Sequence, residues 1–332
     1  MAEPELDSLA ERLLSIIRTK PGERFPTEKL LQKLTCDYDT LRRAGKLLAD
    51  WKYRVKRNRK AFTFIKAPDL LTEIEIAHGL KTKSIGRTLV CYRTVKSTND
   101  IASGLAERGA EHGTVVVADQ QTKGRGRLGR VWHSPPETGI YVSILLRPSF
   151  HPERAPAVSI MTAAALADTF SQYAPGEVQI KWPNDVWIGG KKAAGILTEL
   201  SADKKSVHHI VIGVGINVNQ RVGQFPEEIR PLATSLRRAV KRKVRRVEVL
   251  QSFLVNIERE YRNYEKDGLR KSHAKIRRYS ALIGHDIGIR TGNALVEGRA
   301  LDIDIEGRLI MDQNGTAVPI TAGEVSVVKR QG

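Results

Sequence analysis

The chain has 332 residues, of which 41% are hydrophobic and 28% charged, and its formal net charge is +18. This length exceeds one ordinary hydrophobic core, so we expect two or three domains, and the composition excludes a chain that is disordered throughout. The positive charge favours a polyanionic or acidic partner without identifying one, because net charge acts on association and not on the fold.

No stretch predicts a membrane span or a secretion signal. Apolar runs such as IYVSILL, residues 140–146, are much shorter than the ~20 residues that cross a bilayer, and the acidic start of the chain lacks the basic region of a signal peptide. Cys36 and Cys91 lie far apart in the sequence and have no metal-ligand spacing. We therefore expect a protein of the reducing cytoplasm that has no membrane partner.

The first segment, residues 1–68, has the pattern of three helices followed by a β-hairpin. Ser8 and Glu11 have the spacing of a capping box within an apolar helical stripe, TEKLLQKL predicts a second helix, and Asp37 can cap a third. Apolar and charged residues then alternate on both sides of a turn at RNRK, residues 57–60. This order is typical of a winged helix-turn-helix, a module that binds DNA in many proteins and mediates packing or protein contacts in others.

Both interpretations of this segment stay open. The residues that would contact DNA are basic and come from the third helix and the hairpin: Arg42, Arg43, Lys46, Lys56, Arg57 and Arg59. Asp37 and Asp39 in the first turn of that helix oppose DNA binding, because carboxylates repel phosphates, although a capping role accounts equally well for Asp37. Gly45 weakens the same helix by about 1 kcal/mol relative to alanine.

The middle segment, residues 71–282, predicts a mixed β-sheet with helices packed against it. Strands are expected at TLVCYRTV, GTVVVADQQ, GIYVSILLRP, VQIKW, DVWIGG, GILTEL and HIVIGVGINVN, and helices at STNDIASGLAERG and AVSIMTAAALADTFSQY. The third segment, residues 283–332, favours a small β-barrel, because its short strands are separated by expected turns at TGN (291–293), EGR (297–299), IEG (305–307) and QNG (313–315).

No set of residues for covalent catalysis stands out. The sequence has no GxSxG or HExxH motif, and His133, His208 and His209 are isolated candidates. GVGIN, residues 213–217, lacks the third glycine of a dinucleotide fingerprint and no helical pattern follows it, so a closely packed strand end is the better interpretation.

Several groups suited to an anion are present instead. The loop GRGRLGRVWHS, residues 124–134, combines bare backbone amides with guanidinium groups, Lys181 precedes a tight turn, and residues 97–99 open a helix. Such a set fits phosphoryl or adenylyl transfer, in which catalysis rests on positioning and charge neutralisation.

Five motifs follow one another through the middle segment: STN at 97–99, QTKGRGRLGRVW at 121–132, KWPND at 181–185, KKAAGILTE at 191–199 and GVGINVN at 213–219. With GEVS at 323–326, they resemble the signatures of the biotin–protein ligases, of the kind that carries an N-terminal winged helix-turn-helix and doubles as a repressor of the biotin operon. Lys123 departs from the family pattern, which has a small residue before the first glycine.

The resemblance implies an α+β multidomain fold and a two-step reaction. The fold would comprise a winged helix-turn-helix at 1–68, a class II synthetase-like ligase domain at 71–282 and a small SH3-like β-barrel at 283–332. In the reaction, biotin and MgATP would give biotinyl-5′-adenylate, and the biotinyl group would pass to a lysine of the biotin carboxyl carrier protein of acetyl-CoA carboxylase or a related carboxylase. The second nucleophile belongs to that acceptor, which accounts for the missing nucleophile here.

The resemblance also implies roles for individual residues. Biotin and its adenylate would be bound by Ser97, Thr98, Asn99, Gln121, Arg125, Gly126, Arg127 and Lys181, of which Lys181, Arg125 and Arg127 would be catalytic. Secondary candidates are Gly124, Gly129, Trp132, Lys192, Gly195 and Asn217, and the ligands of Mg²⁺ are not identified.

Two other functions are weighed against the ligase. A DNA-binding regulator that uses the ligase domain as a biotin sensor would employ residues 1–68 on operator DNA, in the same chain. A lipoate–protein ligase would share the middle fold, but the arginine-rich loop at 124–130 argues against it. The resemblance further suggests a homodimer, which the sequence does not establish.

Overall fold

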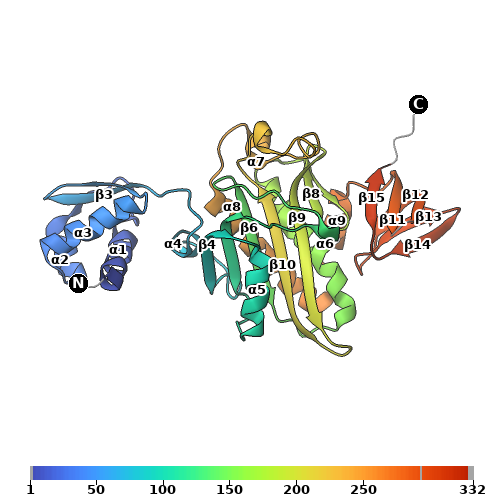
Figure 1. Ribbon diagram of the computed structural model, residues 1–332, viewed down its shortest axis with the longest axis horizontal. Coiled ribbons are helices and arrows are strands. Elements are labelled where there is room, and N and C mark those ends of the chain that lie inside the picture. Colours follow the sequence, from blue (N-terminus) through green and yellow to red (C-terminus); the bar gives the residue numbers. More distant parts are fainter. Residues whose placement is uncertain (1–2, 292–293, 328–332) are drawn as a thin grey trace. The chain divides into compact units, whose positions relative to one another are not determined.

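The computed structural model describes residues 3–291 and 294–327, and the chain divides into two compact units, Met1–Leu70 and Leu71–Gly332 (Figure 1). The third segment of the sequence is therefore grouped with the middle one. Within the described ranges, no helix is long and apolar enough to cross a membrane.

The first unit combines three helices with a small antiparallel sheet in the order β1-β3-β2. Its elements are α1 (Glu3–Ile17), β1 (Phe25–Pro26), α2 (Thr27–Leu34), α3 (Tyr38–Asp50), β2 (Arg54–Arg57) and β3 (Ala61–Lys66). Helix α1 begins at Glu3, so the predicted capping box is wrong and Ser8 lies inside the helix. Asp37 is the N-cap of α3, since its Oδ1 accepts a hydrogen bond from Thr40 N at 2.7 Å.

Gly45 has a packing role in α3. A Cβ at this position would lie 2.6 Å from Cε1 of Phe62 on β3, closer than real Cβ contacts. The intrinsic cost of glycine in this helix is therefore offset by the close approach of α3 to the sheet.

The second unit contains a seven-stranded sheet in the order β4-β5-β6-β10-β9-β8-β7. Strands β4 and β5 pair in parallel and the other neighbours pair antiparallel. The strands are β4 (Leu89–Val95), β5 (Val115–Gln121), β6 (Gly139–Leu146), β7 (Val178–Lys181), β8 (Asp185–Ile188), β9 (Lys191–Ala202) and β10 (Val207–Asn217), at the positions that the sequence predicts.

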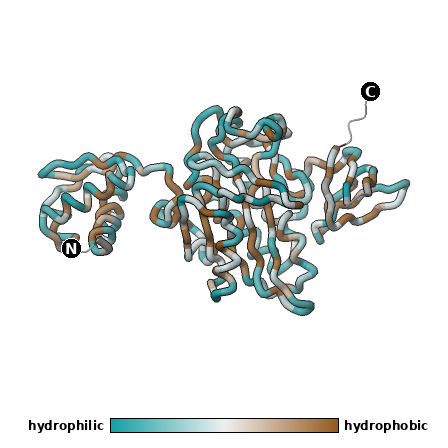
Figure 2. Tube along the Cα trace, viewed as in Figure 1, coloured by the Kyte–Doolittle hydropathy of each residue, from teal (hydrophilic) through white to brown (hydrophobic). Residues whose placement is uncertain are grey.

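Helix α5 (Thr98–Glu107) packs on one face of this sheet, and α6 (Val158–Ser171) and α8 (Arg246–Asp267) pack on the other. The other helices of the unit are α4 (Glu73–Ala77), α7 (Leu236–Val240) and α9 (His273–Tyr279), and short 3₁₀ turns lie at Arg127–Gly129, Pro152–Ala157 and Val222–Gln224. Because side chains alternate along a strand, Val116, Leu145 and Val211 pack under α5, whereas their neighbours face α6 and α8 in the main core. Figure 2 shows hydrophobic residues gathered along these central strands.

Helix α8 was not expected from the sequence, although its buried residues have clear helical spacing. Val247, Leu250, Leu254, Ile257 and Tyr261 recur every three or four residues and are buried against the sheet and α6. The charged residues between them masked this stripe.

The last part of the chain forms a five-stranded antiparallel sheet in the order β14-β13-β12-β11-β15. Its strands are β11 (Asp286–Thr291), β12 (Ala294–Ile303), β13 (Leu309–Gln313), β14 (Thr316–Ile320) and β15 (Glu324–Val327). Turns occur at IEG and QNG as predicted, with φ of 80° at Gly307 and 83° at Gly315. Gly292 and Asn293 of the expected TGN turn lie outside the described residues.

The turn predicted at EGR, residues 297–299, is wrong, because β12 runs through it. A Cβ on Gly298 would lie 2.1 Å from the carbonyl oxygen of Asp312 on β13. Glycine at this position therefore permits the two strands to approach closely and does not mark a turn.

Candidate functional site

A cavity of about 460 Å³ lies where the start of α5, the loop after β5, the β7–β8 turn and strands β9 and β10 meet. Most residues that the sequence singled out for chemistry line it: Ser97, Thr98, Asn99, Gln121, Arg125, Gly126, Arg127, Trp132, His133, Lys181, Lys192, Gly195 and Asn217. Segments far apart in the chain thus converge on one site.

Four singled-out residues lie outside the lining. Gly124 shapes the loop, because a Cβ there would lie 2.6 Å from the carbonyl oxygen of Trp132, and Gly129 has a φ of 73° that favours glycine. His208 belongs to the β9–β10 hairpin region, where its Nε2 lies 3.5 Å from Asp203, and neither it nor His209 reaches the cavity.

The floor of the cavity is a chain of buried polar groups. Thr98 N donates to Gln121 Oε1 at 2.9 Å, and Gln121 Nε2 donates to Ser134 Oγ at 3.1 Å. Ser143 Oγ donates to Asn99 Oδ1 at 2.6 Å. These groups are held in place before any ligand arrives, because each already has a partner.

Glycines on the strands make room for this floor. A Cβ on Gly213 would lie 2.1 Å from Asn99 Oδ1, and a Cβ on Gly215 would lie 2.2 Å from Trp132 Nε1. A Cβ on either glycine would project from the α5 face of β10, because the two positions are separated by one residue and side chains alternate along a strand. The GVGIN motif is therefore a closely packed strand segment, as the sequence analysis favoured.

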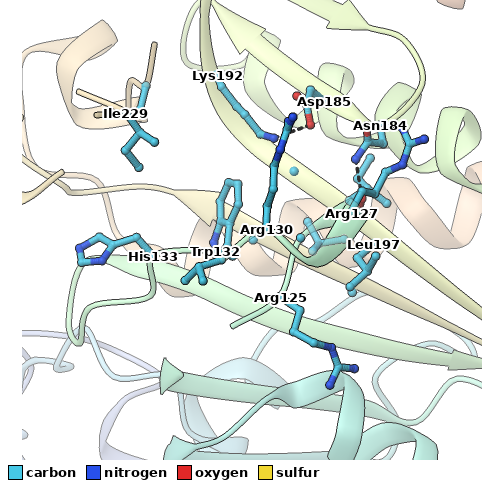
Figure 3. A pocket seen from close by; sticks show the side chains of 18 of the residues that line it. Arg125, Arg127, Arg130, Trp132, His133, Asn184, Asp185, Lys192, Leu197 and Ile229 are labelled. Carbon is cyan, nitrogen blue, oxygen red and sulfur yellow. Dashed lines mark hydrogen bonds and ion pairs between the residues drawn. The ribbon is translucent and has the colours of Figure 1, made fainter. Parts of the chain in front are cut away.

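The glycine–arginine loop, residues 124–130, reaches over the cavity and directs its arginines differently. Arg127 Nη1 donates to Asn184 Oδ1 at 3.1 Å and Nη2 lies 3.5 Å from the carbonyl oxygen of Gly323. Arg125 instead pairs with Asp100 at 2.5 Å and with Glu199 at 2.8 Å. Figure 3 shows Arg127 turned to Asn184 and Arg125 pointing away from it. Hydrogen bonding to Asp100 raises the pKa of Arg125, and Glu199 adds to the shift.

Two lysines enter the cavity from the sheet. Lys181 ends β7 with Nζ 4.8 Å from the ring centroid of Trp187, and Lys192 pairs with Asp185 at 2.7 Å. The lysines and Arg127 place three cations beside a polar floor, an arrangement that suits a ligand with a polar head and an anionic tail.

Several lining residues were not expected at the site from the sequence. Asn184, Asp185 and Trp187 contact the cationic side chains; the first two were expected only to form the turn of the KWPND motif. Leu128 and Val131 at the loop tip are 75% and 83% exposed, which periodicity does not reveal.

Comparisons with known proteins identify the family of this chain. The model of the Biotin/lipoate A/B protein ligase family matches residues 90–217, and that of the Biotin protein ligase C terminal domain matches residues 282–328. The chain is 36% identical to the Bifunctional ligase/repressor BirA of Bacillus subtilis over 321 residues, which cover 96% of this chain and 99% of that protein.

Two further relatives extend the comparison. The Biotin--[acetyl-CoA-carboxylase] ligase of Mycobacterium tuberculosis is 34% identical over 235 residues, 69% of this chain and 85% of that protein. The biotin protein ligase from Aquifex aeolicus, solved in complex with biotin and ATP, matches with a TM-score of 0.63 at 31% identity and covers 73% of this chain and 99% of its own. The chain belongs to the biotin–protein ligase family, as its motifs indicate.

Proposed function

We propose that this protein activates biotin with MgATP and transfers the biotinyl group to a lysine of a biotin carboxyl carrier protein. In the first step a biotin carboxylate oxygen attacks the α-phosphorus of ATP, the bond to the β-phosphate oxygen breaks, and pyrophosphate leaves. In the second step the acceptor lysine nitrogen attacks the acyl carbon, loses a proton and displaces AMP. The observation that carries the proposal is the cavity itself, which joins a buried polar floor to a cluster of cations.

The polar floor suits the ring system of biotin. Its ureido group offers one acceptor and two donors, and Ser97, Thr98 and Asn99 at the start of α5 are each no more than 4% exposed. Thr98 and Asn99 have partners within the protein, but the three residues together with Gln121 keep further donor and acceptor capacity, which an apolar acid would bury unused at a cost of about 1–3 kcal/mol each. This cost is the physical basis for preferring biotin over lipoate.

The cations suit the reacting end of the substrate. Lys181 at the end of β7 would neutralise the charge that builds up as the carboxylate approaches the phosphate. Arg127 and Gly126 would close the loop over the adenylate and exclude water, while Arg125 anchors the loop through its carboxylate partners.

Magnesium would enter with ATP. Among the residues that the structure describes, no three histidine, cysteine or carboxylate side chains converge on one point. Mg²⁺ commonly retains water and uses one or two carboxylates beside substrate phosphates, so the single carboxylate of Asp185 in the cavity fits such an ion. The metal would neutralise phosphate charge as part of the substrate.

Biotin-dependent exchange of labelled pyrophosphate into ATP tests the proposal, with lipoate as the competing acid. We expect exchange with biotin alone, and a loss of at least about tenfold in Lys181→Gln because one transition-state charge contact is removed. Lys205→Gln, in the exposed turn after β9, is the matched control. Exchange that requires lipoate, or none with either acid from folded protein, would contradict the assignment.

We also propose that residues 1–68 form a winged helix-turn-helix that binds DNA and that residues 283–332 form an SH3-like barrel. Support for the first part comes from the α2–α3 pair with its β2–β3 hairpin, and from the six basic residues named above, which are all exposed. Asp37 is used as a helix cap, which reduces its conflict with phosphate. Asp39 pairs with Arg42 at 2.8 Å and thereby screens its charge.

Binding of the full-length chain to DNA from upstream of biotin-synthesis genes tests this second function. Arg43→Ala combined with Lys46→Ala should weaken binding and flatten its dependence on salt, because two phosphate contacts are lost. Pyrophosphate exchange should be unchanged in the double variant. Equal affinity for random DNA and for the upstream fragment would indicate a module without operator specificity.

A further inference from the structure

One carboxylate beneath the cavity connects two parts of the site. Glu199 lies on β9 with a side chain that is 35% exposed. Its Oε2 accepts a hydrogen bond from Asn99 Nδ2 at 2.8 Å, and its Oε1 accepts one from Arg125 Nη2 at 2.8 Å. Asn99 belongs to α5 and Arg125 to the glycine–arginine loop, so this carboxylate joins helix, loop and sheet.

The first consequence concerns the amide of Asn99. An ionised carboxylate can only accept hydrogen bonds, so it selects Nδ2 and turns Oδ1 to Ser143, which donates to it at 2.6 Å. Ser143 Oγ also lies 2.8 Å from Thr98 Oγ1, which is 3.1 Å from Gln121 Oε1. The carboxylate, together with the carbonyl oxygen of Leu197 3.4 Å from the same Nδ2, therefore fixes which end of the Asn99 amide faces Ser143 on the floor of the cavity.

The second consequence concerns the loop. Arg125 is held by Glu199 from one side and by Asp100 at 2.5 Å from the other. Two residues further on, Arg127 remains directed at Asn184 (Figure 3). The start of the loop is thus tied to the sheet and α5, while Leu128 and Val131 further along the loop are exposed.

We infer that Glu199 is a positioning residue for biotin activation, which it serves by orienting the Asn99 amide and by anchoring the glycine–arginine loop through Arg125. The inference rests on the proposed function, because a fixed donor and acceptor pattern matters for a ureido group and not for an apolar ring. Glu199 does not line the cavity and acts through its two partners.

Glu199→Gln tests the inference in the full-length protein. A glutamine can accept from Arg125 or from Asn99, but its NH₂ group then faces the other donor unless the Asn99 amide turns over. We expect the KM for biotin and the rate of adenylate release each to rise about tenfold, since a charge-assisted hydrogen bond is lost on each side. The KM for ATP should not change. Glu177→Gln, at an exposed position before β7, is the control.

Two further variants separate the two roles of Glu199, orienting Asn99 and anchoring the loop. Asp100→Asn removes the charge of the other partner of Arg125, so it should speed adenylate release without raising the KM for biotin. In an Arg125→Ala background, Glu199→Gln should no longer change the release rate but should still raise the KM for biotin. A residue that merely stabilised the fold would lower the unfolding temperature and affect both substrates alike.

The outcomes distinguish this inference from the proposed function. If wild-type protein shows biotin-dependent exchange and Glu199→Gln keeps the wild-type KM and release rate, the inference is overturned and the proposed function stands. If wild-type protein shows no exchange with biotin, the proposed function itself fails. Should Glu199→Gln not fold, an unchanged release rate in Arg125→Ala would overturn the anchoring role, because Glu199 anchors the loop through Arg125.

Discussion

Replacing Gly213 by alanine probes how tightly the strand supports the polar floor. The new Cβ would lie 2.1 Å from Asn99 Oδ1, 2.8 Å from its Cγ and 2.9 Å from its Nδ2, all closer than real Cβ contacts. Asn99 is 4% exposed and hydrogen-bonded to Ser143 and Glu199, so it can move only by breaking those bonds. Overpacking and the strained hydrogen bonds together should lower the free energy of unfolding by about 2 kcal/mol.

This cost corresponds to a fall of about 4–8 °C in Tm for a unit of this size, measurable by differential scanning calorimetry. Because the displaced amide belongs to the floor, the KM for biotin in pyrophosphate exchange should rise by more than about tenfold. Gly223→Ala is the matched control, since a Cβ there meets nothing within 4 Å. Gly213→Ala with the Tm and KM of the wild type would refute the argument that strand glycines shape the site.

Three other outcomes are expected. Arg127→Ala should shorten the half-life of the bound adenylate by about tenfold, because the loop loses a contact that closes it, and the variant should label proteins less selectively. The half-life is measured by following the release of labelled adenylate. Trp182→Phe removes the indole N–H that donates to the carbonyl oxygen of Gly307 at 2.9 Å, and should cost about 1 kcal/mol in urea unfolding because a partly buried acceptor loses its hydrogen bond. Burial acts to raise the pKa of Glu258, but hydrogen bonds from the backbone N–H groups of residues 83–85 outweigh it and lower the pKa. A lowered pKa contributes stability above the pKa of the unfolded chain, and this stability is lost as the pH falls through the folded value. Tm measured from pH 6 downward should therefore fall less steeply in Glu258→Gln than in wild type, and parallel curves would contradict the account.

The elements of the catalytic fold followed from local patterns. The strands and the two helices predicted for residues 88–219 appear where alternation and helical spacing placed them, because burial of one face imposes a period on the chain. Two errors of prediction have local causes as well. Gly298 suggested a turn within β12, and the charged residues of α8 concealed its apolar stripe.

The motifs also indicated the family, since each preserves side chains whose chemistry is recognisable at a fixed spacing. They did not reveal the partners of those side chains. Arg125 and Arg127 look equivalent in the sequence, yet one is held by two carboxylates and the other by Asn184 and the last part of the chain.

The sequence by itself determined the order along the chain of the strands that form the ligase sheet, the family and most of the polar and charged residues of the cavity lining that carry the proposed chemistry. Only the tertiary structure decided that Glu199 lies between Asn99 and Arg125, and that Gly213 and Gly215 make room for Asn99 and Trp132. The physical reason is the distance along the chain. Contacts between residues 74 or more positions apart leave no periodic trace in the sequence and form only when strands and helices pack.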